Sequence, residues 1–249
     1  MRVALISDLH ANALALEAVL ADLARAGADR LVCLGDVATL GPHPDAVLGR
    51  LRDLGCACIL GNHDEFLLDA ELIHTYTEAP VVVNAVDWCR DRLAPADRAF
   101  LAGFVPGLDI ELAPGLTLGL YHGSPRSHME DILATTPAER VDEMLGGRAT
   151  VAAVLAGGHT HFQMLRQHRG ALLLNPGSVG IPFKEHMPGQ PPAVLPHAEY
   201  AIVEARSAGG SAGISVELRR VPLDRAALRR AAESAPDNPI TGYLVAQYS

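Results

Sequence analysis

The stretch VALISDLHAN, residues 3–12, joins an apolar run to a polar turn that carries Asp8 and His10. The four apolar residues before the turn are typical of a buried strand. The Ala- and Leu-rich segment after it predicts a helix that begins at Asn12, a favoured N-cap residue, and stops at Gly27. The chain is therefore predicted to open with a strand and a helix, joined by a turn of potential ligands.

The same pattern recurs further along the N-terminal part of the chain. Apolar runs at 31–34 and 56–60 end in turns that carry Asp36 and Asn62, and a helix is predicted over 44–54 between them. This order predicts a β-α-β-α-β opening. Because ligands bind outside the carboxyl ends of the strands in open α/β sheets, the polar turns are expected to converge on one edge.

The rest of the chain continues this alternation. Strands predicted at 116–121 and 151–156 again end in polar turns, at His122 and at His159 and His161. We expect one domain over residues 1–235 and a tail over 236–249. The other predicted elements are helices within 65–104 and over 137–145 and 224–233, a hairpin with arms 162–167 and 171–174, a proline-rich irregular stretch at 182–197, and an antiparallel pair at 200–204 and 214–221.

Composition narrows the class of protein. The 249 residues carry a net charge of −9, which argues against a broad surface for nucleic acid. No apolar run approaches the roughly 20 residues needed to span a membrane, and residues 1–5 lead into a polar motif rather than a signal peptide. We therefore expect a cytoplasmic protein with no membrane partner and no stable nucleic-acid partner. Cys33, Cys56, Cys58 and Cys89 form no C-x-x-C pair and are expected to be reduced.

Seven side chains on the polar turns have the chemistry of metal ligands. An Asp-x-His sequence at a strand end places both side chains on one side of the backbone, because the side-chain period is two. Seven nitrogen and oxygen donors are too many for one tetrahedral zinc and suit two ions that share a carboxylate. Two ions about 3.5–4 Å apart can hold both oxygens of an in-line displacement. The candidates are Asp8, His10, Asp36, Asn62, His122, His159 and His161.

The ordered set D-x-H, G-D, G-N-H-D, H-G-S and G-H-T-H resembles the calcineurin-like metallophosphoesterase superfamily. Gly41-Pro42, the H-G-S-P turn and Asn175-Pro-Gly-Ser-Val-Gly resemble its small bacterial and archaeal phosphodiesterase branch. Taken singly, Asp8 and Asp36 also fit helix caps or Asx turns, so the order of the whole set carries the resemblance. It implies an α/β fold, the four-layer αββα sandwich with mixed β-sheets flanked by helices.

The resemblance also implies the metal ligands and the nucleophile. A hydroxide between two divalent ions is the implied nucleophile, because metal binding lowers the pKa of water toward about 7. Mixed nitrogen and oxygen ligands suit manganese, Fe, Zn, Ni or Co, and the sequence does not select among them. The first ion is expected on Asp8, His10 and His161 and the second on Asn62, His122 and His159, with Asp36 bridging them.

Two further residues are implied to be catalytic. His63 would lie beside the metals and protonate the leaving oxygen or hold the phosphoryl group, since its pKa lies near neutral pH. Asp64 would orient His63 or cap the helix that follows. A purely structural hydrogen-bonding role for His63 is the alternative.

Three functions compete at this point. The first is a phosphodiesterase that acts on small or nucleotide-like phosphate esters, and the second is a phosphomonoesterase or protein phosphatase. A dianionic monoester calls for extra cationic groups, and no arginine stands beside Asn62 and His63, which favours diesters. The third is a non-catalytic scaffold module on the same fold. The apolar residues of the tail leave open whether it packs on its own domain or in a homo-oligomer.

The sequence departs from the family pattern around the site. Thr39 and Leu40 stand where the branch often has Gly-Tyr, so an aromatic wall of the substrate pocket is expected to be missing. Residues 183–197 are longer and richer in proline than is usual for the branch. Arg126 and Lys184 are weaker candidates for contact with a phosphate. His43, His74, His128 and His168 match no ligand position and are expected to be surface or packing residues.

Overall fold

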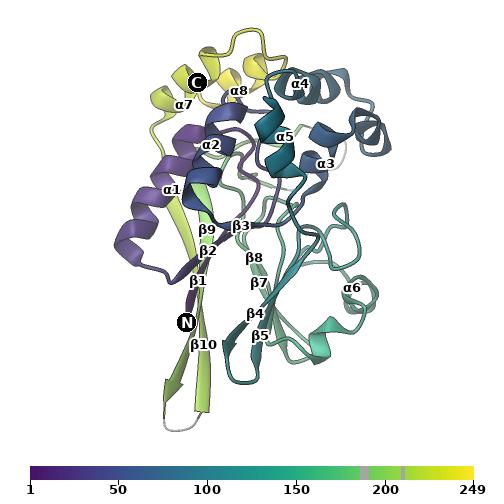
Figure 1. Cartoon of the computed structure of the whole chain (residues 1–249), viewed down its shortest axis with the longest axis vertical. Coiled ribbons are helices and arrows are strands. Elements are labelled where there is room, and N and C mark those ends of the chain that lie inside the picture. Colours follow the sequence, from purple (N-terminus) through teal and green to yellow (C-terminus); the bar gives the residue numbers. More distant parts are fainter. Residues whose placement is uncertain (186–190, 209–210) are drawn as a thin grey trace.

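The computed structural model describes residues 1–185, 191–208 and 211–249, which form four layers (Figure 1). Two five-stranded mixed sheets pack face to face, and helices cover both outer faces, so the predicted αββα sandwich is confirmed. In spatial order the first sheet contains β10 (Ser211–Pro222), β9 (His197–Ala208), β1 (Arg2–Ile6), β2 (Arg30–Cys33) and β3 (Ala57–Cys58), and the second contains β4 (Leu108–Ala113), β5 (Leu116–Leu120), β6 (Val154–Ala156), β8 (Ala171–Asn175) and β7 (Met164–His168).

Strand β1 shows why these apolar runs form the centre of a sheet. Val3 and Leu5 pack into the core between the two sheets, whereas Ala4 and Ile6 pack into the core beneath the helices. Successive side chains of a strand point to opposite faces, so a strand covered on both faces needs an uninterrupted apolar run. The side chains of VALI thus alternate between the two cores, which places β1 in an inner sheet of the sandwich.

Helices from both ends of the chain cover the first sheet (Figure 1). Asn12 begins the first of them as predicted, and its side-chain oxygen accepts a hydrogen bond from the backbone of Ala15. The outer face of the second sheet packs against a single α-helix, α6 (Ala138–Leu145), among the described residues. The first sheet is covered by α1 (Ala13–Ala26), α2 (Pro44–Leu54), α3 (Asn62–Leu68), α4 (Pro80–Arg90), α5 (Pro95–Leu101), α7 (Arg225–Glu233) and α8 (Thr241–Gln247), with short 3-10 helices at Ala70–Thr75 and Arg148–Thr150 elsewhere.

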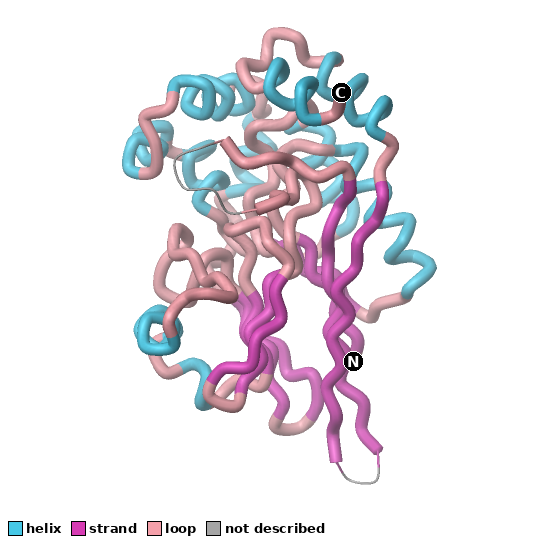
Figure 2. The backbone as a smooth tube through the Cα atoms, turned by 180° about the vertical axis from the view of Figure 1, so that it is seen from behind, coloured by secondary structure: helices cyan, strands magenta, loops and turns pink. Residues whose placement is uncertain are grey.

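The parallel strands of both sheets deliver their following loops to one end of the sandwich. Strand β1 is parallel to β2 and β2 to β3, while β5 is parallel to β6 and β6 to β8. Figure 2 shows the loops after these strands gathered between the sheets and the layer of helices above them. The polar turns therefore converge as expected, but they come from two sheets, whereas the sequence indicated the edge of one.

The predicted and observed elements differ most in three parts of the chain. Strand β4 was not predicted, because it alternates apolar and acidic residues and lies at the edge of its sheet. The hairpin of β9 and β10 is longer than predicted, since its far end extends beyond the sheet and has no apolar pattern (Figure 2). Residues 241–247 of the expected tail form α8, and Leu244 and Tyr248 are buried in the core beneath the helices. The irregular stretch at 182–197 includes residues 186–190, which lie outside the described residues.

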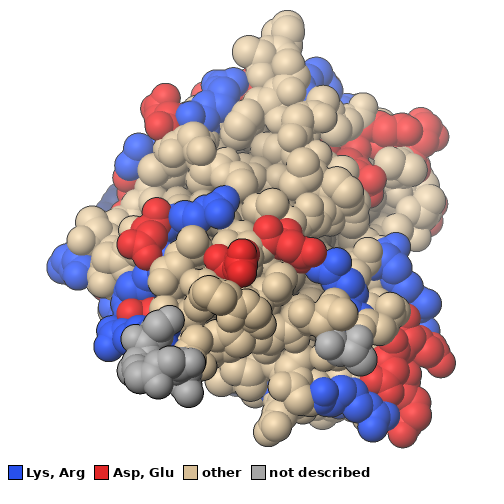
Figure 3. All heavy atoms as spheres, turned by 60° about the horizontal axis from the view of Figure 1, so that its bottom comes forward, with Lys and Arg blue, Asp and Glu red and all other residues tan. Residues whose placement is uncertain are grey.

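The surface carries charges of both signs. On the face drawn in Figure 3, acidic and basic side chains alternate instead of forming one basic patch. In the described part of the chain, no helix combines the length and the hydropathy that crossing a membrane requires. All four cysteines are free thiols, and Cys33, Cys58 and Cys89 are buried.

Candidate metal centre

The turns of the two sheets bring their acidic and histidine side chains together in two groups. In each group one ligand atom per residue lies within 4.8 Å of the corresponding atoms of the others. Asn62 joins the second group, because its Oδ1 lies 3.2 Å from Nε2 of His122. The structure thus brings together all seven candidates. The first group is Asp8, His10 and His161, and the second is Asp36, His122 and His159.

The backbone at these positions is unusual. Asp8, His10, Asp36, His159 and His161 all have a positive φ, between 43° and 66°. Residues other than glycine rarely adopt this left-handed conformation, which costs about 1–3 kcal/mol each where the surroundings impose it. Such strain concentrates at functional sites. Five of the seven candidates share this conformation, and so do Ala11, Leu40 and Arg169, so it supports the assignment of the site but does not define the ligands.

Close packing of the turns requires glycine at several positions, of which Gly61 and Gly158 bear directly on candidate ligands. A Cβ atom at Gly61 would clash with the carboxylate of Asp36, and one at Gly158 would clash with Ser7 and would lie 2.7 Å from Oδ2 of Asp8. Both glycines therefore let a neighbouring turn approach a candidate ligand directly. This need accounts for the glycines that precede Asn62 and His159 in the sequence.

The histidine rings are oriented by hydrogen bonds on their outer nitrogens. Nδ1 of His122 donates to the carbonyl of Leu34 at 2.7 Å, and Nδ1 of His161 donates to the carbonyl of Ile181 at 2.8 Å. A carbonyl only accepts, so these bonds fix the direction of each ring and turn Nε2 inward. Metal-bound histidines are commonly held in this way.

Thr39 orients a further ring of the site. Nδ1 of His10 lies 3.1 Å from the hydroxyl of Thr39, and Nε2 of His10 lies 3.1 Å from Nε2 of His161. The sequence had indicated Thr39 only as a departure from the family pattern. Two inward ring nitrogens at this distance, with Asp8 beside them, suit a shared cation.

The electrostatics of the centre also favour cations. Burial disfavours a charged imidazole, yet Asp36 and Asp8 raise the pKa of His122 to about 10. Burial alone would raise the pKa of Asp36, but His122 and His63 hold it well below its usual range. Burial is the main cause that lowers the pKa of His159, to about 4. The two carboxylates thus draw positive charge into a buried site, and a metal ion that bound there would release protons.

His63 lies at the edge of the centre with its ring facing the cavity described below. Its backbone N–H donates to Oδ1 of Asp36 at 2.9 Å, and its ring packs edge-on against His10 with centroids 5.1 Å apart. The side chain is 5% exposed, and Nδ1 has no hydrogen-bond partner. The ring of His63 thus lies beside the candidate ligands and lines the cavity, with one buried nitrogen that has no hydrogen-bond partner.

Asp64 holds two turns of the first sheet together. Its carboxylate accepts hydrogen bonds from the backbone of Asp36 at 2.8 Å, Val37 at 2.9 Å and Gly61 at 2.9 Å. Burial, followed by the charge of Asp36, raises the pKa of Asp64 to about 7. Of the two roles expected for Asp64, the cap of α3 is observed in these bonds, while the carboxylate makes no hydrogen bond to the His63 ring.

Three polar residues that the sequence did not assign hold the remaining turns. Nδ2 of Asn175 donates to the carbonyl of Gly158 at 2.6 Å, and Oγ of Ser178 donates to the carbonyl of Asp8 at 2.7 Å. Asp131 lies 3.4 Å from Nε2 of His159. The N-P-G-S motif was the available signal for Asn175 and Ser178, but no pattern marked Asp131. Asn12 does more than cap its helix, because Nδ2 also donates to the carbonyl of Gly180.

A cavity of about 750 Å³ opens beside the candidate ligands. His10, Asp36, His159 and His161 line it on one side, together with His63. A smaller cavity of about 240 Å³ adjoins it and also reaches His159. The described residues that line the two cavities include no Lys or Arg.

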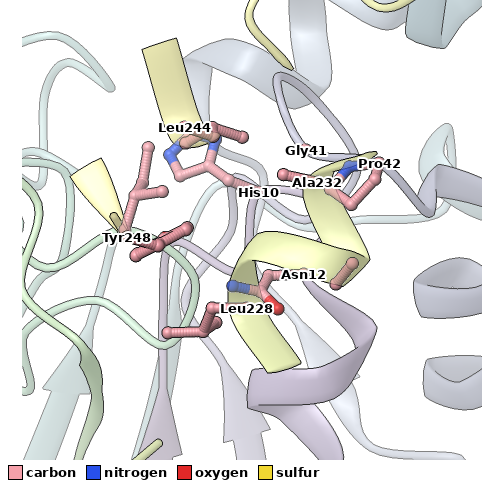
Figure 4. A pocket seen from close by; sticks show the side chains of 10 residues that line it. His10, Asn12, Gly41, Pro42, Leu228, Ala232, Leu244 and Tyr248 are labelled. Atoms are coloured by element: carbon pink, nitrogen blue, oxygen red, sulfur yellow. The ribbon is translucent and has the colours of Figure 1, made fainter. Parts of the chain in front are cut away.

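The C-terminal helices lie next to the candidate ligand His10. Leu228 of α7 and Leu244 of α8 line a small cavity next to His10, with Tyr248 beside them (Figure 4). Leu244 also lines the large cavity on its other side. Residues beyond the expected domain boundary at 235 therefore line the same cavity as His10.

The weaker candidates lie elsewhere. Arg126 pairs with Glu130, and Lys184 lies 3.8 Å from Glu185. The four histidines that match no ligand position make contacts with side chains outside the two metal-ligand groups: His43 with Ser234, His74 with Glu78, His128 with Glu65 and His168 with Asp142.

The structure is a sandwich of two sheets with two groups of metal-type ligands at its loop end. This arrangement is that of a class of metal-binding hydrolases. The chain belongs to the calcineurin-like phosphoesterase superfamily, whose domain model matches residues 1–201. Membership in this superfamily implies a phosphoester hydrolase that binds divalent metals.

Three similar proteins span nearly the full chain. An uncharacterized protein of Methanocaldococcus jannaschii is 27% identical over 248 residues, which cover 97% of this chain and 95% of that protein. The crystal structure of a metallophosphoesterase from Sphaerobacter thermophilus is 25% identical with a TM-score of 0.72, covering 100% of this chain and 98% of that one. A hypothetical protein of Pyrococcus horikoshii shares the fold at 19% identity and a TM-score of 0.75, with 96% of each chain covered.

Proposed function

We propose that the protein hydrolyses phosphodiesters with two divalent metal ions, and that Asp36 is a ligand of both. The observation that supports a shared ligand is the position of one side-chain oxygen, Oδ2 of Asp36. Oδ2 of Asp36 lies 3.3 Å from Nε2 of His122 in the second group and 3.9 Å from Nε2 of His10 in the first. The residues that would hold the first ion are Asp8, His10 and His161, and those for the second are Asn62, His122 and His159, with Asp36 common to both.

The net charge of this ligand set suits an anionic substrate. Asp8 and Asp36 are its two carboxylates, while the other five ligands are neutral as metal ligands. When bound, two divalent ions supply Lewis acidity and a nucleophile at neutral pH. Two carboxylates do not neutralise four positive charges, so the site keeps an attraction for a phosphate group within an acidic protein.

His63 supplies a proton to the leaving oxygen in this proposal. Its ring lines the large cavity next to His10 and has a nitrogen without a partner. Burial lowers the pKa of His63 from its ordinary value, so this role requires the negative charge of a bound phosphate to favour the protonated ring. Asp64 acts as a positioning residue, because it holds the turn of Asp36 against Gly61.

The charge of the cavities favours diesters over monoesters. A dianionic monoester is best held by Arg or Lys, and the described lining residues include neither. Asp131, which lines the smaller cavity beside His159, adds negative charge that repels a second phosphate charge. A diester with a single negative charge avoids both costs.

The test compares matched substrates on protein loaded in turn with Mn, Fe, Zn, Co and Ni. Bis(p-nitrophenyl) phosphate and p-nitrophenyl phosphate share a leaving group and differ in charge. We expect metal-dependent hydrolysis with a higher kcat/KM for the diester. A higher value for the monoester would support the phosphatase alternative, and two bound ions without turnover of either ester would support the scaffold alternative.

A further inference from the structure

Aromatic side chains gather at the site in a chain that contains few of them. Phe, Tyr and Trp make up 4% of the sequence, yet Tyr76, Phe183 and Tyr243 all line the large cavity. Phe183 stacks on the ring of His161, with centroids 4.3 Å apart and an interplanar angle of 20°. Tyr76 packs edge-on against His63 at 5.7 Å. Leu40 lines the cavity without an aromatic ring, as expected at that position, but other elements supply aromatic rings to the cavity.

The rest of the lining is apolar and larger than a phosphate group needs. Leu40, Val82 and Ile181 are among the aliphatic residues that line it. Its volume of about 750 Å³ lies in the range of sites that hold whole small molecules. Such sites are mostly apolar, with a few polar groups that fix orientation. Here the polar groups are the candidate metal ligands and His63 on one side, with Thr77 elsewhere in the lining.

Two lining residues are exposed although they are apolar. Tyr76 is 48% exposed and Val81 is 44% exposed, and both border the cavity. Exposed apolar side chains that gather at a concave site mark a place where a ligand is bound. Core packing does not account for them, because each leaves nearly half of its surface in solvent.

We propose that this cavity binds a planar, apolar group of the substrate, so that the substrate is a phosphodiester with an aryl or nucleobase-like ester group. The inference rests on the proposed function. Phe183 and Tyr76 offer ring faces and edges for stacking, which any flat aromatic group accepts. A polyphosphate chain is disfavoured, because its further charges would meet apolar residues and Asp131 instead of Arg or Lys.

The first experiment compares two diesters that share the p-nitrophenyl leaving group and differ in the second ester group, methyl or phenyl. Each kcat/KM is divided by the rate of uncatalysed hydrolysis. We expect the phenyl diester to be favoured by about 10- to 100-fold, the range for burial of one such apolar group. Equal corrected values would overturn the inference and leave the proposed function intact.

The second experiment measures binding without turnover. Calorimetry of diphenyl phosphate and dimethyl phosphate on the metal-loaded protein should show tighter binding of the diphenyl ester, with a negative heat-capacity change. If neither diester is hydrolysed but diphenyl phosphate still binds more tightly, the proposed function fails and the cavity assignment stands. Equal affinities would overturn the cavity assignment.

A matched pair of variants locates the effect. Tyr76→Ala and Leu165→Ala each shorten an apolar side chain of nearly equal exposure, 48% and 47%, but Leu165 lies on β7 outside the cavity lining. We expect Tyr76→Ala to reduce the phenyl-to-methyl preference by about tenfold, and Leu165→Ala to leave it unchanged. A disturbed His63 would slow both diesters alike, so an unchanged preference in Tyr76→Ala would contradict the role of Tyr76.

Discussion

The two sheets contribute different chemistry to the same centre. The turns of the first sheet carry both carboxylates, Asp8 and Asp36, whereas the turns of the second carry three histidines. Each ligand group mixes the two sources, because His161 joins Asp8 in the first group and His122 joins Asp36 in the second. Neither sheet therefore holds a complete site. The first sheet sets the charge of the centre, and the second completes the number of donors.

The sheets also hold their turns by opposite kinds of hydrogen bond. On the first sheet, the Asp64 carboxylate accepts from three backbone N–H groups. On the second, the Asn175 amide donates to the carbonyl of Gly158 and to Thr160. Replacing the Asp64 carboxylate by a neutral amide and removing the Asn175 amide have different costs, so the two positions allow a direct comparison.

The largest effect is expected at Asp36, and comparison with His122 distinguishes the loss of a charged ligand from the loss of a neutral one. Asp36→Ala should abolish binding of both ions and reduce kcat/KM by more than the roughly 10²–10⁴-fold of a lost general acid. His122→Ala removes a neutral donor and should weaken chiefly one ion. Metal content per chain, measured by mass spectrometry, checks both variants. Two ions retained by Asp36→Ala would contradict the bridging role.

His63→Ala tests the proton donor that the first sheet contributes. Turnover should fall by about 10²–10⁴-fold on diesters with poor leaving groups and by less with p-nitrophenol, which needs little protonation. Metal content should not change, because His63 is not among the proposed ligands. His74→Ala, an exposed histidine that pairs with Glu78, serves as the control. An equal loss on good and poor leaving groups would remove His63 from the protonation step.

The residues that hold the turns should have a smaller effect than the ligands. Asp64→Asn and Asn175→Ala should each weaken metal binding by about 10- to 100-fold, the usual range for groups behind the ligands. We expect the greater loss for Asp64→Asn, because an amide cannot accept all three backbone bonds and its nitrogen would face N–H donors. Titration against a chelator measures both affinities. A greater loss of metal affinity in Asn175→Ala than in Asp64→Asn would contradict the expected order.

The smallest effect concerns ion pairs between each sheet and its covering helix. Asp22 on α1 accepts from the hydroxyl of Tyr200 at 2.7 Å and pairs with Arg219 at 2.9 Å, and the Tyr200 bond is the main cause that lowers its pKa. Asp142 on α6 pairs with Arg169, which with His168 lowers the pKa of Asp142 to about 2. Asp142 is the more exposed, so its pair is more strongly screened by solvent.

Both carboxylates have a lowered pKa in the folded state, so their stabilisation is present above the unfolded pKa of about 3.9 and is lost as pH falls below it. Asp22→Asn should lower Tm by no more than about 4 °C at pH 7. The difference from the unaltered protein should shrink at pH 3. Asp142→Asn should have the weaker effect at pH 7. Thermal unfolding at the two pH values checks this, and a deficit of Asp22→Asn that persists unchanged at pH 3 would contradict the assigned cause.

The sequence predicted what short-range patterns encode. Apolar runs that end in polar turns identified β1 and β2, and Asn12 was correctly placed as a helix cap. The order of Asp, Asn and His motifs indicated the superfamily and the residues that the structure brings together. These features depend on neighbours within a few positions, which a single sequence contains.

Contacts between segments that are distant in the sequence could not be predicted from such short-range patterns. Phe183 and Tyr243 reach the cavity from segments with no motif, and Thr39 orients His10 although it looked like a departure. Asp64 bonds to a turn 28 residues away, whereas its sequence position suggested only the local roles of orienting His63 or capping its own helix. Strand β4 was missed because one polar face and an edge position leave a weak apolar signal.

Strand β1 leaves the ribosome about two hundred residues before its antiparallel neighbour β9, with Arg2 opposite Glu204. At typical translation rates of 5–20 residues per second, this interval lasts roughly 10–40 s. Until β9 arrives, one edge of an apolar strand presents unpaired backbone groups, which promote aggregation. Nascent chains arrested before residue 204 should therefore need chaperones, whereas the completed chain covers that edge itself.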